Sequence, residues 1–170
     1  MILFRTIHKD YFSTWFDYRN SKSFKHGARW NLPNIPATYT SSNAQNAMLE
    51  CANYTPSPKA ANRLYRLCVF EVPELRLKNI EPTDLPDKWF QKSSQTQTQE
   101  LGSKYLLNPD YEGIVVPSVT INHGIATHPI NAIRHSVWAN VVINLDTIGI
   151  DRIKLIEVCE PLFSTRMFGA

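Results

Sequence analysis

Cysteine is scarce in this chain, and the few thiols follow no ligand pattern. The 170 residues include only three cysteines, which are Cys51, Cys68 and Cys159. An odd number of thiols without a Cys-x-x-Cys spacing argues against both a disulfide framework and a zinc site. We therefore expect these side chains to be small apolar residues in the core of a cytoplasmic protein.

A long apolar run is also missing from the N-terminus. The opening sequence MILFRTIHKDYF places a charge at Arg5, which comes too early for a signal peptide or a membrane span. We therefore expect a cytoplasmic location and no association with a membrane.

Charge of one sign is not concentrated anywhere in the sequence. The net charge is +3, and lysine and arginine are spread from Arg5 to Arg166. Such mild and dispersed basicity does not indicate direct binding to nucleic acid, although it can favour an anionic small molecule. The chain has no visible repeat or low-complexity tract, and its length suits one domain over residues 1–170.

Several catalytic and cofactor motifs are absent. The histidines are too dispersed for an HExxH zinc motif, so we expect no metal. No GxSxG elbow and no GxGxxG loop occurs, which argues against a hydrolase serine and a Rossmann mode of dinucleotide binding. Cys51 directly follows Glu50, and a neighbouring carboxylate disfavours the thiolate that a nucleophile needs.

Apolar and β-branched patterns predict a single α+β domain with a central mixed or antiparallel sheet. A helix is expected after an N-cap at Ser42 or Asn43, with Glu50 near its last full turn, and another from about Thr96 to Leu106. The expected strands lie in ILFRTI (2–7), PATYTS (36–41), RLYRLCVFEVP (63–73), YEGIVVPSV (111–119), HSVWANVVINL (135–145) and IDRIKLIEV (150–158).

The stretch from residue 26 to residue 50 gathers polar and aromatic groups that folding alone does not require. Arg29 has the side chain best shaped to bind a phosphate at two points. Trp30 and Tyr39 offer flat apolar faces, and residues 40–42 supply hydroxyl groups, Ser41 among them. Together they indicate a pocket for a planar, phosphorylated ligand.

Glu50 closes this stretch and adds a negative charge. If a glycosidic bond of the ligand breaks through an oxocarbenium-like state, a nearby carboxylate lowers the barrier. The plain alternative is that Arg29 and Glu50 form a surface ion pair, because such pairs are common and weak.

The runs GARWN, PATYTSS, AMLE and VVPSV resemble the RES-domain toxin family, which is named after its Arg, Glu and Ser. In this sequence those residues are Arg29, Glu50 and Ser118. The similarity continues through QELGSKYLL and WANVVINL, so it covers most of the chain. It departs from the family pattern at Asn144, which is followed by Leu145 where the family often has proline.

This resemblance implies an ADP-ribosyltransferase-like fold and an enzyme that degrades cellular NAD. Members of the family cleave the nicotinamide–ribose bond as glycohydrolases or phosphorylases, so NAD is a substrate, inorganic phosphate is an alternative acceptor to water, and no cofactor is expected. The family also implies a partner, a cognate antitoxin of the Xre helix-turn-helix type.

The resemblance further assigns catalytic roles by position. Arg29 contacts the phosphates or the ribose, Tyr39 stacks on nicotinamide, Glu50 stabilises the ribosyl cation, and Ser118 completes the pocket by hydrogen bonding. Each role has a structural alternative. Tyr39 can be ordinary strand packing, and Ser118 after Pro117 can be a simple turn residue.

Four more residues are expected to bind the substrate: Arg5, Trp30, Ser41 and Asn140. By resemblance, Arg5 joins Arg29 at the phosphates or ribose, and Asn140 contributes a hydrogen bond. The alternatives are that Arg5 pairs with a carboxylate within its strand and that Asn140 only satisfies backbone groups.

Two other functions remain open at this stage. One keeps the same pocket and transfers ADP-ribose to a protein side chain. Transferases of this kind commonly carry an acidic or amide residue two positions before the glutamate, where this chain has Met48. The other is a noncatalytic nucleotide-binding or RNA-binding module that uses its aromatic residues, Trp15, Tyr18 and Trp30.

Overall fold

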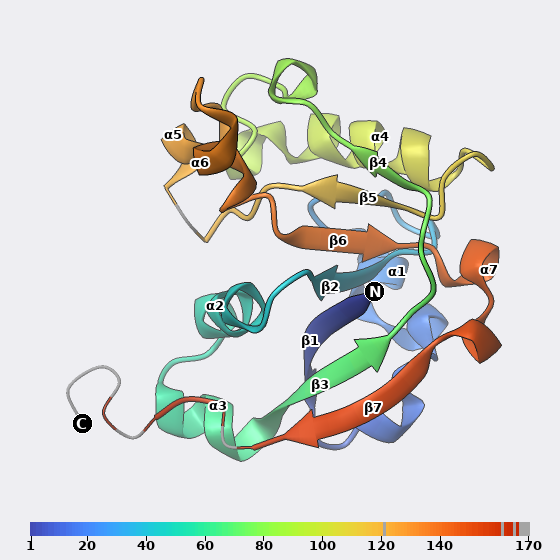
Figure 1. Cartoon of the computed structure of the whole chain (residues 1–170), viewed down its shortest axis with the longest axis vertical. Helices are drawn as coiled ribbons and strands as arrows, with labels where there is room; N and C mark the ends of the chain where they lie inside the picture. The colour runs from blue at the N-terminus through green and yellow to red at the C-terminus, as the bar shows by residue number, and fades with distance from the viewer. Residues whose placement is uncertain (121, 161, 165, 167–170) are drawn as a thin grey trace.

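The computed structural model describes residues 1–120, 122–160, 162–164 and 166. Within this part of the chain a single sheet has the strand order β4-β5-β6-β2-β1-β3-β7, which Figure 1 shows from β4 at the top to β7 at the bottom. The β4–β5 pair is parallel and the others are antiparallel, so the expected α+β domain with a mixed sheet is confirmed. The strands are β1 (Ile2–His8), β2 (Thr38–Ser41), β3 (Tyr65–Glu71), β4 (Leu77–Asn79), β5 (Gly113–Val116), β6 (Asn140–Ile143) and β7 (Lys154–Cys159).

Strands β1 and β2 share the fewest paired residues of any two neighbouring strands in the described sheet. The register between these strands consists of one pair, Phe4 opposite Ser41. By contrast, β1 pairs with β3 along its whole length, from Ile2 opposite Glu71 to His8 opposite Tyr65. The strands β1 and β2 are therefore joined by fewer paired residues than β1 and β3.

Side-chain alternation gives the sheet two different faces around this junction. Ser41 lies opposite both Phe4 and Asn140, so these three side chains share what we call the helical face. Arg5 lies opposite Cys68, and Thr40 lies opposite Val141. They therefore point to the other side, which we call the opposite face.

Three helices cover the helical face: α2 (Ala44–Tyr54), α3 (Pro58–Leu64) and α4 (Gln95–Leu106). Leu106 of α4 packs with Ile114 and Val142 of the sheet, and Ala61 of α3 packs with Leu67. Helix α2 begins at Asn43, whose side chain accepts a hydrogen bond from the backbone N–H of Asn46 at 2.8 Å. This confirms one of the two expected N-caps and fixes the start of the helix that carries Glu50.

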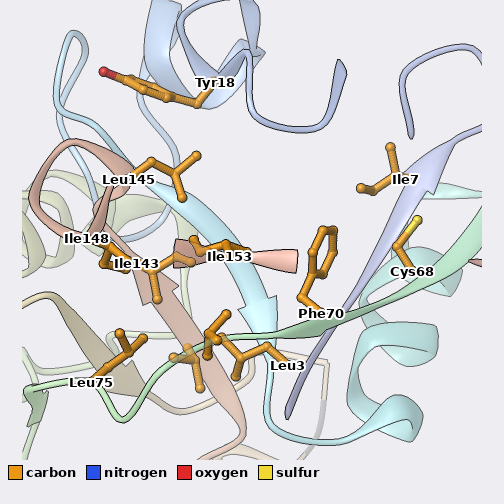
Figure 2. Close-up of a cluster of buried hydrophobic side chains, with 12 residues drawn as sticks. Leu3, Ile7, Tyr18, Cys68, Phe70, Leu75, Ile143, Leu145, Ile148 and Ile153 are labelled. Carbon is orange, nitrogen blue, oxygen red and sulfur yellow. The ribbon is translucent and has the colours of Figure 1, made fainter. Parts of the chain in front are cut away.

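The opposite face is covered by the segment after β1 and the segment after β6. These contain η1 (Phe12–Thr14), η2 (Tyr18–Asn20), α1 (Lys22–His26), α7 (Leu145–Ile148) and η5 (Ile150–Arg152). Figure 2 shows Leu3, Phe70 and Ile153 turned toward a common space from three separate segments. One of the hydrophobic cores therefore lies on this side of the sheet.

Helix α4 also fixes the loop that carries Arg29. Gln99 Nε2 donates to the carbonyl oxygen of Ala28 at 2.8 Å, and Ser103 Oγ accepts from the N–H of Leu32 at 2.8 Å. Gly102 lies so close to the Trp30 carbonyl that any Cβ would collide with it. The expected helix from about Thr96 is confirmed. Its buried polar residues Gln99 and Ser103 hydrogen-bond the backbone of the loop that carries Arg29.

Several short elements differ from the sequence-based expectation. The expected strand at 63–73 begins only at Tyr65, because Ser57 and Pro58 start helix α3, which ends at Leu64. Strand β4 lies in a stretch where no strand was expected, and the strand expected at 135–145 begins at Asn140. The remaining short elements are η3 (Pro82–Asp84), η4 (Lys92–Ser94), α5 (His123–Ala126) and α6 (Asn131–His135).

The departure from the family pattern at Asn144 is accommodated by a helix cap. Asn144 Oδ1 accepts from the N–H groups of Asp146 and Thr147 at 3.0 and 3.4 Å, and its Nδ2 donates to the carbonyl of Leu106 at 2.9 Å. Leu145 is buried in the core. Among the described residues, no helix combines the length and apolar character needed to cross a membrane.

Candidate active site

Glu50 is held on the helical face through one of its two carboxylate oxygens. Oε1 accepts hydrogen bonds from Ser118 Oγ and from Asn140 Nδ2, both at 2.8 Å. The side chain is half-buried, and within the described residues Oε2 has no hydrogen bond. The two donors therefore orient the carboxylate and leave one oxygen available to a ligand.

Ser118 is buried and makes three polar contacts. Besides donating to Glu50, its Oγ lies 2.6 Å from Thr120 Oγ1 and accepts from the N–H of Thr120 at 3.2 Å. A serine has a single hydroxyl proton, and here that proton points to Glu50. The hydroxyl of Thr120 must then donate to Ser118, so this serine orients the carboxylate and is not free to act as a nucleophile.

Asn140 links Glu50 to a second buried amide. Its Oδ1 accepts from Asn46 Nδ2 at 2.6 Å, and the same Nδ2 donates to Ser41 Oγ at 2.8 Å. Asn46 is one helical turn before Glu50, so both side chains point to the same side of α2. The network from Ser41 through Asn46 to Asn140 fixes which way Asn140 presents its N–H to Glu50.

Arg29 lies near Glu50 without forming an ion pair with it. Its Nη1 donates to the carbonyl oxygens of Trp89 and Gln91 at 3.0 and 2.8 Å. Burial lowers the pKa of Arg29, and electrostatic interactions with Tyr54, Tyr39 and Glu50 partly oppose this effect. Arg29 therefore lies within electrostatic reach of Glu50, while its Nη1 is held by backbone carbonyl oxygens.

Tyr39 fixes the loop of Arg29 through its hydroxyl. The oxygen accepts from the N–H of Trp30 at 2.9 Å and donates to Asn31 Oδ1 at 2.7 Å. Burial raises the pKa of the Tyr39 hydroxyl far above its usual range, so the group stays protonated and can keep donating. Since Tyr39 is half-buried, part of its side chain remains accessible for contact with a ligand.

Three residues expected to bind the substrate are buried or lie on the other face of the sheet. Trp30 is 1% exposed and packs against Trp89 in the core, and Ser41 is 3% exposed beneath Asn46. Arg5 points to the opposite face of the sheet because it is an odd number of positions from Phe4 in the strand. Glu50 is joined to Ser118 and Asn140 by hydrogen bonds, and Arg29 and Tyr39 lie within electrostatic reach of it. Ser41 is linked to this group through Asn46, whereas Arg5 lies on the other face of the sheet.

The structure adds residues that the sequence reasoning missed. Asn46 and Tyr54 lie four residues before and after Glu50, a spacing that could have identified both as neighbours on the helix. Tyr54 is 76% exposed and lies within electrostatic reach of Arg29. Cys51 is buried, and burial raises the pKa of its thiol, which agrees with a structural role.

The arrangement is suited to stabilising positive charge. An oriented carboxylate with one free oxygen can favour a cation that develops during bond cleavage, and an arginine beside it can hold the anionic part of the same molecule. Among the described residues, no group of three or more His, Cys, Asp or Glu side chains could hold a metal ion.

Comparison with known proteins shows similarity to a family, to a curated protein and to a solved structure. The model of the RES domain family matches residues 2–146. The protein named Toxin Res from Photorhabdus laumondii subsp. laumondii is 26% identical over 153 residues, which cover 89% of this chain and 95% of that protein. A chain of the crystal structure of the M. tuberculosis MbcT-MbcA toxin-antitoxin complex has a TM-score of 0.60 at 18% identity, covering 93% of this chain and 82% of that chain. The last match shows a common fold.

Proposed function

The chain belongs to the RES domain family. On that premise we propose that it is the toxin of a toxin–antitoxin pair and that it degrades NAD in the cytoplasm. The observation that carries this proposal is the state of Glu50, which is held through Oε1 by two buried donors, while Oε2 has no hydrogen bond among the described residues and Arg29 lies within electrostatic reach. The names of the similar proteins support the toxin assignment.

The proposed reaction breaks the bond between nicotinamide and ribose. The bonding electron pair leaves with the pyridinium nitrogen, so nicotinamide departs neutral and the positive charge moves to the ribose. Oε2 of Glu50 stabilises this charge, while Arg29 holds the pyrophosphate. Water then adds to the ribose carbon and releases a proton, giving ADP-ribose; inorganic phosphate in its place gives the phosphorylated sugar.

The interaction between Glu50 and the positive charge on the ribose is large enough to change the rate of bond cleavage. Two opposite charges about 4 Å apart interact by roughly 4 kcal/mol in a partly shielded site, and removal of such a group typically costs about 10²- to 10³-fold in turnover. Ser118 and Asn140 set the carboxylate before the substrate arrives, so little of this energy is spent on reorientation.

The direct test measures NAD loss by the purified protein. We expect Glu50→Gln to keep its fold and lose turnover about 10²- to 10³-fold. The matched control is Glu100→Gln, because Glu100 is an exposed helical glutamate of α4, and it should behave as the wild type. Equal NAD loss by the wild type and Glu50→Gln would contradict the role of Glu50.

The reaction products show whether water, inorganic phosphate or a protein side chain accepts the ADP-ribosyl group. Reactions with and without inorganic phosphate distinguish hydrolysis from phosphorolysis by the mass of the sugar product. Labelled NAD in a cell lysate tests transfer to protein, since only transfer fixes label on a polypeptide. We favour a small-molecule acceptor because Met48, at the position that transferases give to an acidic or amide residue, packs with Cys51 and Ala61 in a hydrophobic cluster.

The proposed partner is an antitoxin of the Xre helix-turn-helix type that covers the site. Expression of the chain alone should arrest growth, and co-expression of the product of the adjacent gene should restore it. Glu50→Gln should permit growth without the partner. Arrest of growth by Glu50→Gln to the same extent as by the wild type would separate toxicity from NAD cleavage.

A further inference from the structure

Two aromatic rings from distant parts of the chain stack face to face. The ring centroids of Phe90 and His123 are 3.7 Å apart, and the two planes are inclined by 18°. Phe90 is half-buried, whereas His123, the first residue of α5, is exposed. One face of the imidazole therefore rests on Phe90, and the exposed surface of His123 includes its other face.

The core holds Phe90 in place from behind. Phe90 meets Trp89 edge to face, with ring centroids 6.2 Å apart and planes at 89°. Trp89 is buried against Trp30, and Phe90 packs against the same hydrophobic cluster. The stack is therefore built on a ring that the fold has already fixed, and a fixed surface loses little conformational freedom when a ligand binds.

The segment around Phe90 also holds Arg29. The carbonyl oxygens that accept from Arg29 Nη1 belong to Trp89 and Gln91, the residues directly before and after Phe90. A guanidinium has five N–H donors, and those on Nε and Nη2 of Arg29 have no hydrogen bond among the described residues. These remaining donors can bind an anion next to the segment that carries Phe90.

The segment around His123 leads back to Glu50. His123 is the fifth residue after Ser118, and the hydroxyl of Ser118 donates to Glu50 at 2.8 Å. Figure 1 shows α5 and α2 on the left of the view, where β6 begins. The stack of Phe90 and His123 therefore joins the loop that holds Arg29 to the segment that orients Glu50.

The plain alternative is that the stack only anchors α5, which has four residues. Any apolar contact with Phe90 would do that, and it would not require a flat ring with one face exposed. Tyr54 is a second exposed ring near Arg29, but among the described residues no other ring lies behind it. His123 is therefore the better prepared surface for a flat ligand group.

We propose that the exposed face of His123 binds the adenine of NAD, with Phe90 as the positioning residue behind it and the pyrophosphate on Arg29. A purine base is flat and uncharged, and it stacks readily on aromatic side chains. This inference rests on the proposed function and adds to it a source of specificity. The protein should prefer NAD to nicotinamide mononucleotide, which lacks the adenine half.

The binding test uses AMP as the probe and ribose 5-phosphate as its control. Both molecules carry the same sugar phosphate, and only AMP carries the base. Stacking of one base on an aromatic side chain corresponds to about 5- to 100-fold in affinity, so calorimetric titration of the full chain should show AMP binding tighter by this factor. Equal affinities for the two molecules would overturn the proposal.

Substitutions at His123 locate the base. His123→Leu should lower the affinity for AMP to about that for ribose 5-phosphate, whereas His123→Tyr, which restores a flat ring, should recover most of the loss. His135→Leu is the matched control, because His135 is an exposed histidine at the end of the short helix α6, and its affinity should equal that of the wild type.

Two results of this series would contradict the assignment. Unchanged affinity for AMP in His123→Leu would show that the stack only anchors α5. Loss of AMP binding in Tyr54→Leu, with AMP binding retained in His123→Leu, would place the base on α2 instead.

Kinetics separate this inference from the proposed function. The ratio of kcat/KM for NAD to that for nicotinamide mononucleotide should fall about 5- to 100-fold in His123→Leu, through a rise in KM for NAD. If the wild type cleaved both substrates equally well, the adenine site would be wrong while the role of Glu50 stood. If the wild type left NAD intact, the proposed function would fail, and the AMP titration would still decide whether His123 binds a base.

Discussion

On the helical face of the sheet, one oxygen of Glu50 accepts two hydrogen bonds, whereas on the opposite face Arg5 finds no acceptor among the described residues. Both side chains are half-buried and lie near the junction of β1 and β2. The difference lies in the neighbouring residues. Ser118 and Asn140 donate to Glu50, whereas no acceptor among the described residues pairs with the guanidinium of Arg5.

This comparison distinguishes a charged group that the fold orients from one that the fold leaves without a partner. Two donors fixed by the fold hold Glu50 in one orientation, which suits a reactive carboxylate. A buried polar group without a partner costs stability. We expect substitutions in the first region to change turnover and substitutions in the second to change stability.

The largest effect within the network is expected at Ser118. Ser118→Ala removes a charge-assisted donor from Glu50, and we expect turnover of NAD to fall about 10- to 100-fold, corresponding to roughly 1.5–3 kcal/mol. Ser136→Ala is the control, because Ser136 is exposed and its hydroxyl bonds only to the carbonyl of Ile133. Steady-state kinetics on both variants checks this, and turnover of Ser118→Ala at the wild-type rate would break the link between Ser118 and Glu50.

The sequence alone predicts some of the residues around Glu50 and misses others. The family motif identified Glu50 and Ser118, and the fold class followed from the strand patterns. Period-two alternation in β1 could have separated Arg5 from Glu50, but only with the register of β1 against β2 in hand. Asn46 carries no motif at all, and its role depends on Asn140, which is 94 residues away.

Glu112 provides a buried carboxylate with a purely structural environment, for comparison with Glu50. Burial alone would raise its pKa, but the N–H of Arg76 and the side chains of Arg152 and Arg76 outweigh this, so the pKa of Glu112 is lowered. A lowered folded-state pKa stabilises the protein above the unfolded value, near pH 4.3, and this stability is lost as the pH falls through the folded value.

We therefore expect Glu112→Gln to reduce the free energy of unfolding at neutral pH by about 1–3 kcal/mol. The loss should shrink as the pH falls below about 4, where the wild type also loses the charge. Denaturant unfolding from pH 7 to pH 3 measures both quantities. A difference between the two proteins that grows on acidification would contradict the sign of the pKa shift.

Asn46 tests how far the network extends from Glu50. Asn46→Ala removes the donor to Asn140 Oδ1, and we expect kcat to fall a few-fold, equivalent to about 1 kcal/mol, with KM nearly unchanged. Asn53→Ala is the matched control, because Asn53 is an exposed asparagine of the same helix. A change in KM alone would instead assign Asn46 to substrate binding.

The smallest effect concerns the two threonines of β2. Thr38→Val should raise the free energy of unfolding by up to about 1 kcal/mol, since it removes a buried hydroxyl that has no partner among the described residues. Thr40→Val should lower it by about 0.5–1.5 kcal/mol, because it breaks a hydrogen bond to Val141. Equal effects of the two substitutions in thermal unfolding would remove the contrast between a satisfied and an unsatisfied hydroxyl.

The affinity of the Glu50→Gln variant for intact NAD tests the account of the helical face most directly. Arg29 and Tyr39 are unchanged in this variant, so titration calorimetry should show NAD binding with a Kd within a few-fold of the wild-type KM, and the NAD recovered afterwards should be uncleaved. If this variant bound no NAD, or bound it and released nicotinamide at the wild-type rate, the assignment of Glu50 as the group that stabilises the departing charge would be contradicted.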